Sequence, residues 1–320
     1  MDREQLEKNQ IPVYFVAIIV AAIGGLLAPN ASQALGALVT PAIAVLMYAM
    51  FLQIPFLDLR EGLANKRFMT ALLTANFVAI PLLVWALTMG ITDHPAILVG
   101  ALLVLLTPCI DYVVVFTHIG KGDSKLTLAA TPLLLLLQLV LLPLYLALML
   151  GNDSAVVISV RPFVEAFVVL IALPLVLAVA TAAGAERSRV VEGWNNAWAW
   201  MPVPAMAAVL VVVIGSQISA VVRDMDKLLP VIPVYVGFML LAPLVGALVA
   251  RAFKLPAITA RSVAFSSSTR NSLVVLPLAL ALPEEIRGLA AAAVITQTLI
   301  ELVSELIYIR VIPALVWRKA

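Results

Sequence analysis

Reactive and ionisable side chains interrupt several long apolar stretches of this sequence. They are Cys109, Asp111, Arg270, Glu301 and Glu305. Such groups are costly in an apolar environment, and where they occur they commonly mark substrate or proton pathways. A thiol, a guanidinium and carboxyl groups can together bind a small polar ligand and exchange protons with it. The sequence has no HExxH motif, nucleophile elbow or ATP-binding motif, so it indicates neither an enzyme nor ATP-driven transport.

The composition explains why these side chains are unusual. Of the 320 residues, 63% are hydrophobic and 12% are charged, and the mean hydropathy is +1.11. A membrane-spanning helix takes about 20 apolar residues, so the hydrophobic residues suffice for roughly ten spans and leave little for a soluble domain. The net charge of +2 gives no electrostatic reason to expect a nucleic-acid partner. The composition therefore predicts a polytopic helical protein of the lipid bilayer.

Charged or turn-forming residues divide the chain into ten apolar stretches. Their approximate limits are 11–29, 33–57, 68–90, 95–117, 126–150, 162–183, 198–221, 228–250, 262–282 and 287–315. With the N-terminus in the cytosol, most lysine and arginine residues also fall on the cytosolic side, as the positive-inside rule requires. We therefore expect a multi-pass protein of the cytoplasmic (inner) cell membrane with both termini in the cytosol.

The spacing of these stretches predicts an internal repeat. Polar interruptions centred near Pro108 and Arg270 lie 162 residues apart, and the third and eighth stretches begin about the same distance apart. Because each half has an odd number of spans, the halves lie in opposite orientations, which is the inverted-repeat plan of secondary transporters. The predicted fold is one all-α domain over residues 1–320 with ten transmembrane helices. Its two inverted five-helix repeats cover about 11–150 and 162–315, with broken, crossing helices 4 and 9.

The two broken helices are expected to form the substrate site, because inverted-repeat carriers bind substrate where matching helices are interrupted near the membrane midplane. Pro108 removes a backbone donor within the fourth stretch, and the polar run 266–272 interrupts the ninth. Lipid does not tolerate such a run, so it must line a cavity or pack against protein. Its candidate substrate-binding residues are Ser268, Arg270 and Asn271.

Asp111 and Arg270 lie at similar depths in these two helices, and two interpretations remain open. They can form a structural ion pair that locks the crossing. Alternatively, Arg270 polarises an oxygen-bearing ligand while Asp111 carries a coupling proton. Both interpretations can hold at once.

A polar stripe runs along the tenth stretch, in which Gln297, Glu301, Glu305 and Tyr308 fall on one helix face. Glu301 lies near the middle of the stretch, and Glu305 lies one turn closer to the cytosol. A carboxyl group at that depth can load and release a proton during a transport cycle, which makes both residues candidates for proton coupling together with Asp111. The alternative is a neutral carboxylic acid that makes one fixed hydrogen bond.

Cys109 is the only cysteine, so no internal disulfide can form. A lone cysteine in a membrane helix commonly packs as a small hydrophobic residue. Its neighbours, a proline and an acid in a broken helix, also make it a candidate functional thiol, because a nearby cation such as Arg270 would favour the thiolate.

Residues 108–116, with the sequence PCIDYVVVF, and the Lys121-Gly122-Asp123 that follows resemble the fourth-helix signature of the arsenite efflux permeases. These permeases belong to the bile acid:sodium symporter superfamily. Arg270-Asn271-Ser272 lies where that family has an asparagine-containing unwound segment, and Glu301 lies where it has its tenth-span glutamate. The sequence departs from the better-known permeases at Asp111 and Arg270, and it lacks the ninth-helix glutamate and glutamine with which the sodium-coupled branch serves sodium.

The resemblance implies a fold of panel and core domains and proton antiport that exports arsenite, with antimonite as a further substrate. It also implies that Cys109 and Glu301 are essential. Arsenous acid prefers a soft thiolate ligand, and one thiol allows a single exchangeable bond, so Cys109 would hold transported arsenic rather than a structural metal. No cofactor is expected, and the oligomeric state is left open. The alternative is an ion-coupled carrier of a small organic anion with the same fold, anchored by Arg270; a receptor or an intramembrane enzyme ranks below both.

Overall fold

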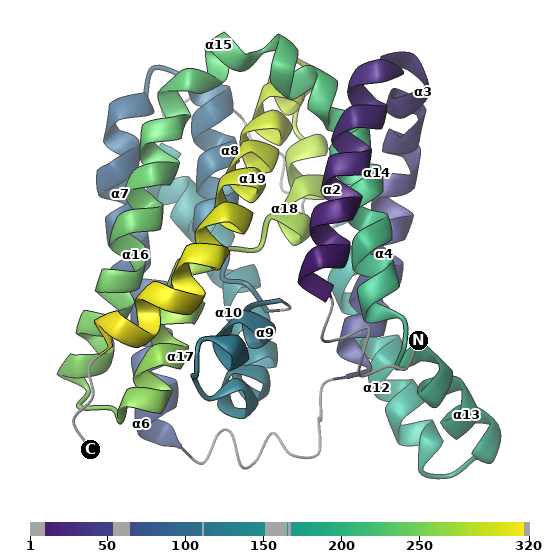
Figure 1. Cartoon of the computed structure of the whole chain (residues 1–320), viewed down its shortest axis with the longest axis vertical. Coiled ribbons are helices and arrows are strands. Elements are labelled where there is room, and N and C mark those ends of the chain that lie inside the picture. The colour runs from purple at the N-terminus through teal and green to yellow at the C-terminus, as the bar shows by residue number, and fades with distance from the viewer. Residues whose placement is uncertain (1–9, 54–64, 111, 151–164, 166–167, 317–320) are drawn as a thin grey trace. The chain divides into compact units, whose positions relative to one another are not determined.

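The computed structural model describes residues 10–53, 65–110, 112–150, 165 and 168–316, and the regular structure of these residues is helical (Figure 1). In chain order the helices are α2 (Gln10–Leu27), α3 (Pro29–Ala34), α4 (Val39–Phe51), α6 (Lys66–Thr74), α7 (Ile80–Thr88), α8 (Pro95–Leu105), α9 (Val113–Ile119), α10 (Ser124–Leu150), α12 (Leu173–Ala185), α13 (Arg189–Trp198), α14 (Pro202–Arg223), α15 (Met225–Leu228), α16 (Ile232–Ala252), α17 (Ala257–Ser268), α18 (Ser272–Leu280) and α19 (Glu284–Leu315). Short 3-10 or π-helical segments join some of them: η1 (Leu35–Leu38), η2 (Ala75–Ala79), η3 (Met89–Ile91), η4 (Val168–Ala172) and η5 (Leu229–Val231).

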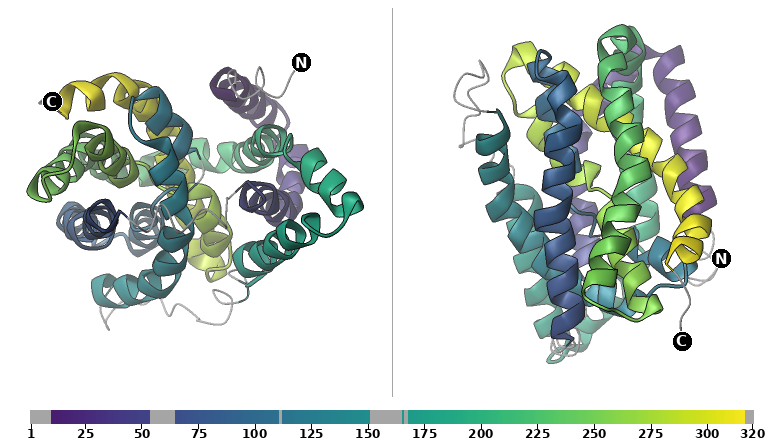
Figure 2. Two further views of the ribbon diagram at one scale, coloured as in Figure 1. Left: turned by 90° about the horizontal axis from the view of Figure 1, so that it is seen from below. Right: turned by 90° about the vertical axis from the view of Figure 1, so that its left-hand side faces the viewer.

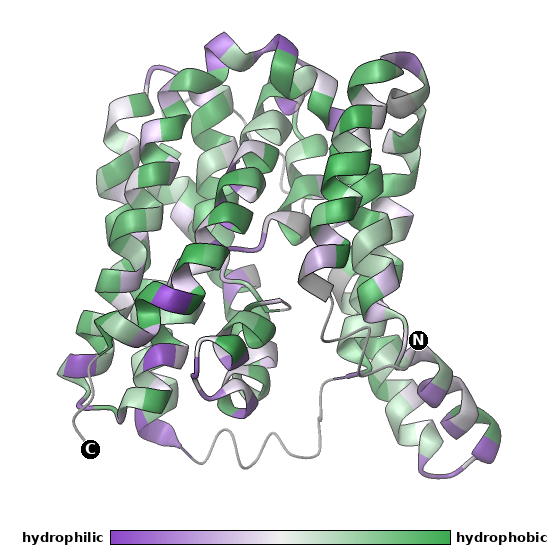
Figure 3. Ribbon diagram, viewed as in Figure 1, coloured by the Kyte–Doolittle hydropathy of each residue, from purple (hydrophilic) through white to green (hydrophobic). Residues whose placement is uncertain are grey.

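Within the described part of the chain, six helical segments are long and apolar enough to cross a membrane, and the bent helix α10 makes up to seven. They are Pro29–Phe51, Lys66–Ile91, Val168–Ala185, Pro202–Arg223, Met225–Ala252 and Glu284–Leu315. Apolar residues cover most of the helical surface, and polar residues gather toward the helix ends (Figure 3). The chain is therefore an all-helical, multi-pass membrane protein, as its composition predicts. Ten crossings, the inverted repeat and the single domain stay predictions.

The chain divides into two compact units, each of which combines segments from both predicted repeats. Unit 1 comprises Met1–Phe56 and Ser159–Met225, and unit 2 comprises Leu57–Ile158 and Asp226–Ala320. In unit 1, α14 packs along α2 and α4, and α12 packs against α4. The α2–α14 contact is close, because a Cβ on Gly25 would lie 2.6 Å from the carbonyl oxygen of Gly215. Small residues at such a contact let helix backbones approach each other.

Unit 2 contains the described residues that are proposed above for substrate and proton binding. Its long helix α19 slants along α8 and also packs against α16 and α18, whereas α17 packs against α16 (Figure 2). The α8–α19 contact is again close, since a Cβ on Gly100 would lie 3.0 Å from the Cα of Ala290. Helix α19 thereby brings its polar stripe against the segments on which the predicted breaks fall.

At two prolines within the helices, a tyrosine hydroxyl donates to the carbonyl oxygen that the proline leaves without a helical donor. Pro81 frees the carbonyl of Phe77, which accepts a hydrogen bond from the Tyr145 hydroxyl (2.6 Å). Similarly, Pro243 in α16 frees the carbonyl of Met239. This carbonyl accepts a hydrogen bond from the Tyr308 hydroxyl of α19 (2.7 Å). These hydrogen bonds tie neighbouring helices together at the points where each helix is weakened.

Candidate functional site

Both predicted helix breaks are present, and they pair with each other. The first separates α8 from α9 and the second separates α17 from α18. An isolated antiparallel bridge joins Pro108 to Arg270 at their centres. It consists of two backbone hydrogen bonds, which run from the N–H of Cys109 to the carbonyl of Thr269 (3.1 Å) and from the N–H of Asn271 to the carbonyl of Thr107 (2.8 Å). Each break therefore satisfies backbone groups that the other leaves open, as backbone in an apolar environment requires.

Asn271 begins the second half of the ninth stretch as the N-cap of α18. Its side-chain oxygen accepts a hydrogen bond from the backbone N–H of Val274 (3.2 Å), which satisfies one of the open donors of the first turn. The Asn271 side chain is buried, and its amide nitrogen has no hydrogen-bond partner among the described residues. The side-chain oxygen of this predicted substrate-binding residue thus caps a helix, while its amide nitrogen is left without a hydrogen bond among the described residues.

The Arg270 side chain is fully buried, with an exposed fraction of 0%. Protein oxygens contact both terminal nitrogens of its guanidinium group, whereas Nε has no hydrogen-bond partner among the described residues. Nη2 lies within hydrogen-bonding distance of three oxygens, which share its two N–H groups: the carbonyls of Ser266 and Ser267 (both 2.7 Å) and the side-chain oxygen of Asn76 (2.9 Å). Nη1 lies 3.4 Å from the carbonyl of Leu105. The guanidinium carbon also lies 5.5 Å from the centre of the Phe238 ring, at cation–π distance. No side-chain ion pair joins Arg270 to a carboxylate in the described part of the chain.

Asn76 comes from the third predicted stretch, where the chain departs from α-helical geometry. The segment η2 is π-helical, and such single turns are frequent at functional sites. The side-chain nitrogen of Asn76 donates to the Ser266 hydroxyl (3.0 Å) and to the Leu72 carbonyl (3.1 Å), so its oxygen is left to face Arg270. Sequence reasoning missed this residue, although a lone asparagine in an apolar stretch is itself a signal of a buried polar contact.

Glu301 of α19 contacts the backbone of the second break. Its carboxylate accepts hydrogen bonds from the backbone N–H of Arg270 (3.1 and 3.0 Å), the Tyr112 hydroxyl (2.5 Å) and the Gln297 side-chain amide. The Tyr112 hydroxyl also lies 3.1 Å from the carbonyl of Arg270. One buried carboxyl group therefore connects α19 with both broken helices.

Glu305 lies one turn further along α19 and contacts the same break. Its Oε1 lies 2.7 Å from the Thr269 hydroxyl, and this hydroxyl lies 2.8 Å from the carbonyl of Phe265. The other carboxyl oxygen, Oε2, is buried and has no hydrogen-bond partner among the described residues. Glu301 and Glu305 are both buried, as their helix face predicts.

Cys109 is buried and lies in the bridge itself, next to Pro108. The structure thus brings three of the predicted site residues, Cys109, Arg270 and Glu301, to one meeting point of the broken helices. Asp111 lies outside the described residues. The ion pair between Asp111 and Arg270 accordingly stays a prediction.

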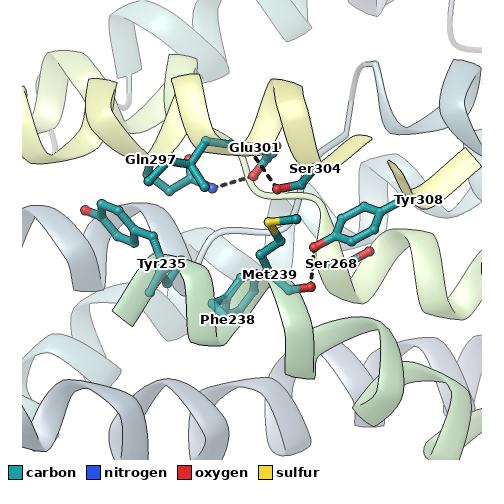
Figure 4. A pocket seen from close by; sticks show the side chains of 10 residues that line it. Tyr235, Phe238, Met239, Ser268, Gln297, Glu301, Ser304 and Tyr308 are labelled. Carbon is teal, nitrogen blue, oxygen red and sulfur yellow. Dashed lines mark hydrogen bonds between the residues drawn. The ribbon is translucent and has the colours of Figure 1, made fainter. Parts of the chain in front are cut away.

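A small pocket opens beside this meeting point, between α16 and α19 (Figure 4). Tyr235, Phe238 and Met239 of α16 face Gln297, Glu301, Ser304 and Tyr308 of α19. The predicted binding residue Ser268 also lines it, with its hydroxyl donating to the Ala264 carbonyl (2.8 Å). The pocket has room for about one water molecule. No group of three or more His, Cys, Asp or Glu side chains that could hold a metal ion occurs in the described ranges.

Paired broken helices that meet around buried charged side chains in a multi-pass helical protein define the class of secondary transporters. A model of the Sodium Bile acid symporter family matches residues 40–224, more than half of the chain, and the chain belongs to this family. It is therefore an ion-coupled membrane transporter of that fold. The match includes Cys109 and the first break but ends before the second break and α19. No curated protein is significantly similar to the chain.

Proposed function

We propose that this member of the family exports trivalent arsenic from the cytosol in exchange for protons, across the cytoplasmic membrane and with both termini in the cytosol. The observation that carries the proposal is the position of Cys109. The only thiol of the chain lies in the bridge that joins the two broken helices, next in sequence to the residue that pairs with Arg270. A bond to substrate at that point would act on both helices at once.

The thiol chemistry suits a carrier because it is reversible. Arsenous acid reacts with one thiol to form a single sulfur–arsenic bond, and the thiol proton leaves with one arsenic-bound hydroxyl group as water. Water reverses the reaction on release. Because one sulfur is available, the arsenic cannot be chelated by several thiols and retained.

Proton coupling is supported by the hydrogen bonds of Glu301. The Tyr112 hydroxyl has one proton but two acceptors within reach, the Glu301 carboxylate and the Arg270 carbonyl. When Glu301 is deprotonated, its carboxylate accepts a hydrogen bond from the Tyr112 hydroxyl. When Glu301 is protonated, it donates to Tyr112 instead, and Tyr112 turns its proton to the carbonyl of Arg270. Protonation of one acid would thus change a hydrogen bond to the backbone of the second break.

The Thr269 hydroxyl is placed in the same way between Glu305 and the carbonyl of Phe265. An ionised carboxylate that is buried without a partner is costly, because its charge is not compensated. A protonated Glu305 avoids this cost. Glu305 is accordingly proposed as the second proton-carrying group, and Asp111 as a third.

The alternative of an organic-anion carrier requires Arg270 to bind substrate directly. Protein oxygens already occupy both terminal nitrogens of its guanidinium group, and Nε alone is buried without a hydrogen-bond partner among the described residues. A carboxylate binds a guanidinium best through two parallel hydrogen bonds, so it would have to displace some of these oxygens. The geometry therefore favours arsenite over an organic anion.

The first experiment measures arsenite accumulation in cells that lack their own exporters. The intact chain is expected to lower accumulation, and Cys109→Ser and Glu301→Gln are expected to abolish that effect at unchanged amounts of membrane protein. Glu284→Gln is the matched control, because Glu284 is an exposed residue of the same helix, with 83% of its side chain accessible. Retained export in Cys109→Ser would refute the thiol mechanism. Uptake of a carboxylate that depends on Arg270 and not on Cys109 would select the organic-anion carrier.

A further inference from the structure

The oxygen cage around Arg270 has the composition of a cation site. Three of its four oxygens are backbone carbonyls, those of Leu105, Ser266 and Ser267, and the fourth is the side-chain oxygen of Asn76. Oxygen atoms of this kind bind hard metal cations as well as guanidinium groups. The cage has no carboxylate among its ligands.

The position of the cage makes it attractive to any cation. Leu105 is the last residue of α8, and Ser266 and Ser267 belong to the last turn of α17. Helix C-termini leave their carbonyls without internal donors and carry partial negative charge. Two such ends meet here, and carriers with broken helices use half-helix C-termini and unwound carbonyls to hold their coupling cations.

In this chain the cage is filled by its own side chain. Arg270 follows Thr269 in the second break, so the positive charge is attached to the backbone that the cage surrounds. The guanidinium is fully buried, and Phe238 covers it at 5.5 Å. A second cation in the same cage would meet both steric overlap and repulsion between like charges.

We propose that Arg270 is a tethered substitute for a coupling cation, so that the two half-helix ends are neutralised by a fixed charge and this site neither needs nor admits sodium. A tethered cation cannot dissociate during the transport cycle. Transport is then coupled to groups that exchange protons. Removal of the Arg270 side chain should open a site for a monovalent cation. The proposal concerns the ion and not the transported substrate, so it does not rest on arsenite export.

The test is the thermal unfolding midpoint of the purified full-length protein in detergent, without substrate, in sodium chloride and in choline chloride at equal ionic strength. The intact chain is expected to have the same midpoint in both salts. Arg270→Ala is expected to unfold at lower temperature in choline and to gain about 2–4 °C or more when sodium replaces it, because a ligand that binds only the folded state stabilises it. Arg287→Ala is the matched control, since Arg287 is an exposed arginine that pairs with Glu284 at the start of α19 (3.1 Å).

Two further variants make the outcome decisive. Arg270→Gln leaves part of the cage open and should show a smaller sodium effect, and Arg270→Lys keeps a tethered cation and should show none. The proposal is overturned if a folded Arg270→Ala or Arg270→Gln protein has the same unfolding midpoint in sodium chloride and in choline chloride. If neither variant is recovered folded, the test uses the intact chain and Arg270→Lys. Equal midpoints in both salts for these two proteins support the proposal. A higher midpoint in sodium for either of them overturns it.

Discussion

At the scale of single residues, the buried polar side chains of the site contact the backbone of the helix breaks as well as one another. Arg270 donates to carbonyls at two helix ends, and Glu301 accepts from the backbone N–H of the same arginine. The two opposite charges are therefore coupled through the second break. In the proposed mechanism, a change in the protonation of Glu301 would reach Arg270 by way of its peptide groups.

Tyr112 is the residue on which this coupling depends most directly. Tyr112→Phe removes the hydroxyl that lies between the Glu301 carboxylate and the Arg270 carbonyl but keeps the ring and its edge-to-face contact with Phe116 (6.0 Å between centroids). We expect at least a tenfold loss of proton-driven arsenite uptake into inverted membrane vesicles, which corresponds to about 1.4 kcal/mol or more. Unchanged uptake would show that the Tyr112 hydroxyl is not part of the coupling.

The sequence was sufficient to predict where the two helices break, but not which side chains and backbone groups would meet there. Proline beside Cys109 and the polar run around Arg270 predicted two breaks, because interrupted apolar helices leave backbone groups that must find partners. The partners of Arg270 could not be predicted. Carbonyl oxygens carry no sequence signal, and their exposure depends on the residue at which each helix ends. Asn76 was missed although a lone asparagine in an apolar stretch is a signal, and its contact with Arg270 could not be predicted because nothing in the sequence marks the π-helical turn on which it lies.

At the scale of helices, close contacts between small residues fix the position of α19, which carries both carboxyl groups. Gly100 of α8 faces Ala290 of α19, and an added Cβ would lie 3.0 Å from its Cα and overlap its carbonyl oxygen. Gly100→Ala should therefore push α8 and α19 apart and destabilise the protein by about 1–3 kcal/mol. Both the unfolding midpoint and transport should fall.

Gly288 provides the internal comparison for this variant. It lies in α19 as well, but a Cβ there would meet nothing within 4 Å. Gly288→Ala should leave the protein unchanged or stabilise it by about 0.5–1 kcal/mol, because alanine is the better helix former. If both alanine variants behaved alike, close packing of α8 on α19 would not be the cause.

The hydrogen bond from Tyr308 to the Met239 carbonyl has a testable origin in Pro243. Tyr308→Phe should cost about 1–3 kcal/mol of unfolding free energy, since it leaves a buried carbonyl without a donor. Pro243→Ala supplies a backbone N–H to the same carbonyl, so Tyr308→Phe should cost much less in that background. A double-mutant cycle by unfolding in detergent measures this difference. Equal costs in the two backgrounds would contradict the assignment.

Helix limits were less predictable than helix breaks. The stretch predicted from residue 198 begins as α14 at Pro202, and Trp194 and Trp198 belong to a separate helix, α13. There Trp194 and Trp198 pack together, with ring centroids 5.6 Å apart, and Trp194 donates to the Tyr48 hydroxyl (3.0 Å). Hydropathy alone joins such a segment to its neighbour, because apolar aromatic residues score alike in an interfacial helix and in a span.

At the scale of the whole molecule, the ion that drives transport is the central question. A tethered Arg270 and two buried carboxyl groups on α19 together favour protons over sodium. Uptake of arsenite into inverted vesicles should accordingly require a pH gradient, acidic inside, and stop when a protonophore is added. Replacement of sodium by choline on both sides should leave the rate unchanged. A rate that follows the sodium gradient would overturn proton coupling for this member of the family.

The bridge between Pro108 and Arg270 also constrains how the protein is made. Its two strands of backbone are 162 residues apart in the chain. At about 5–20 residues per second, the ribosome adds that length in roughly 8–32 s. Throughout that interval the first break has been synthesised but its backbone partner has not, so its polar groups must be kept in contact with water or with the insertion machinery. The broken helix of the N-terminal half can consequently reach its final position in the membrane only after the C-terminal half has been synthesised.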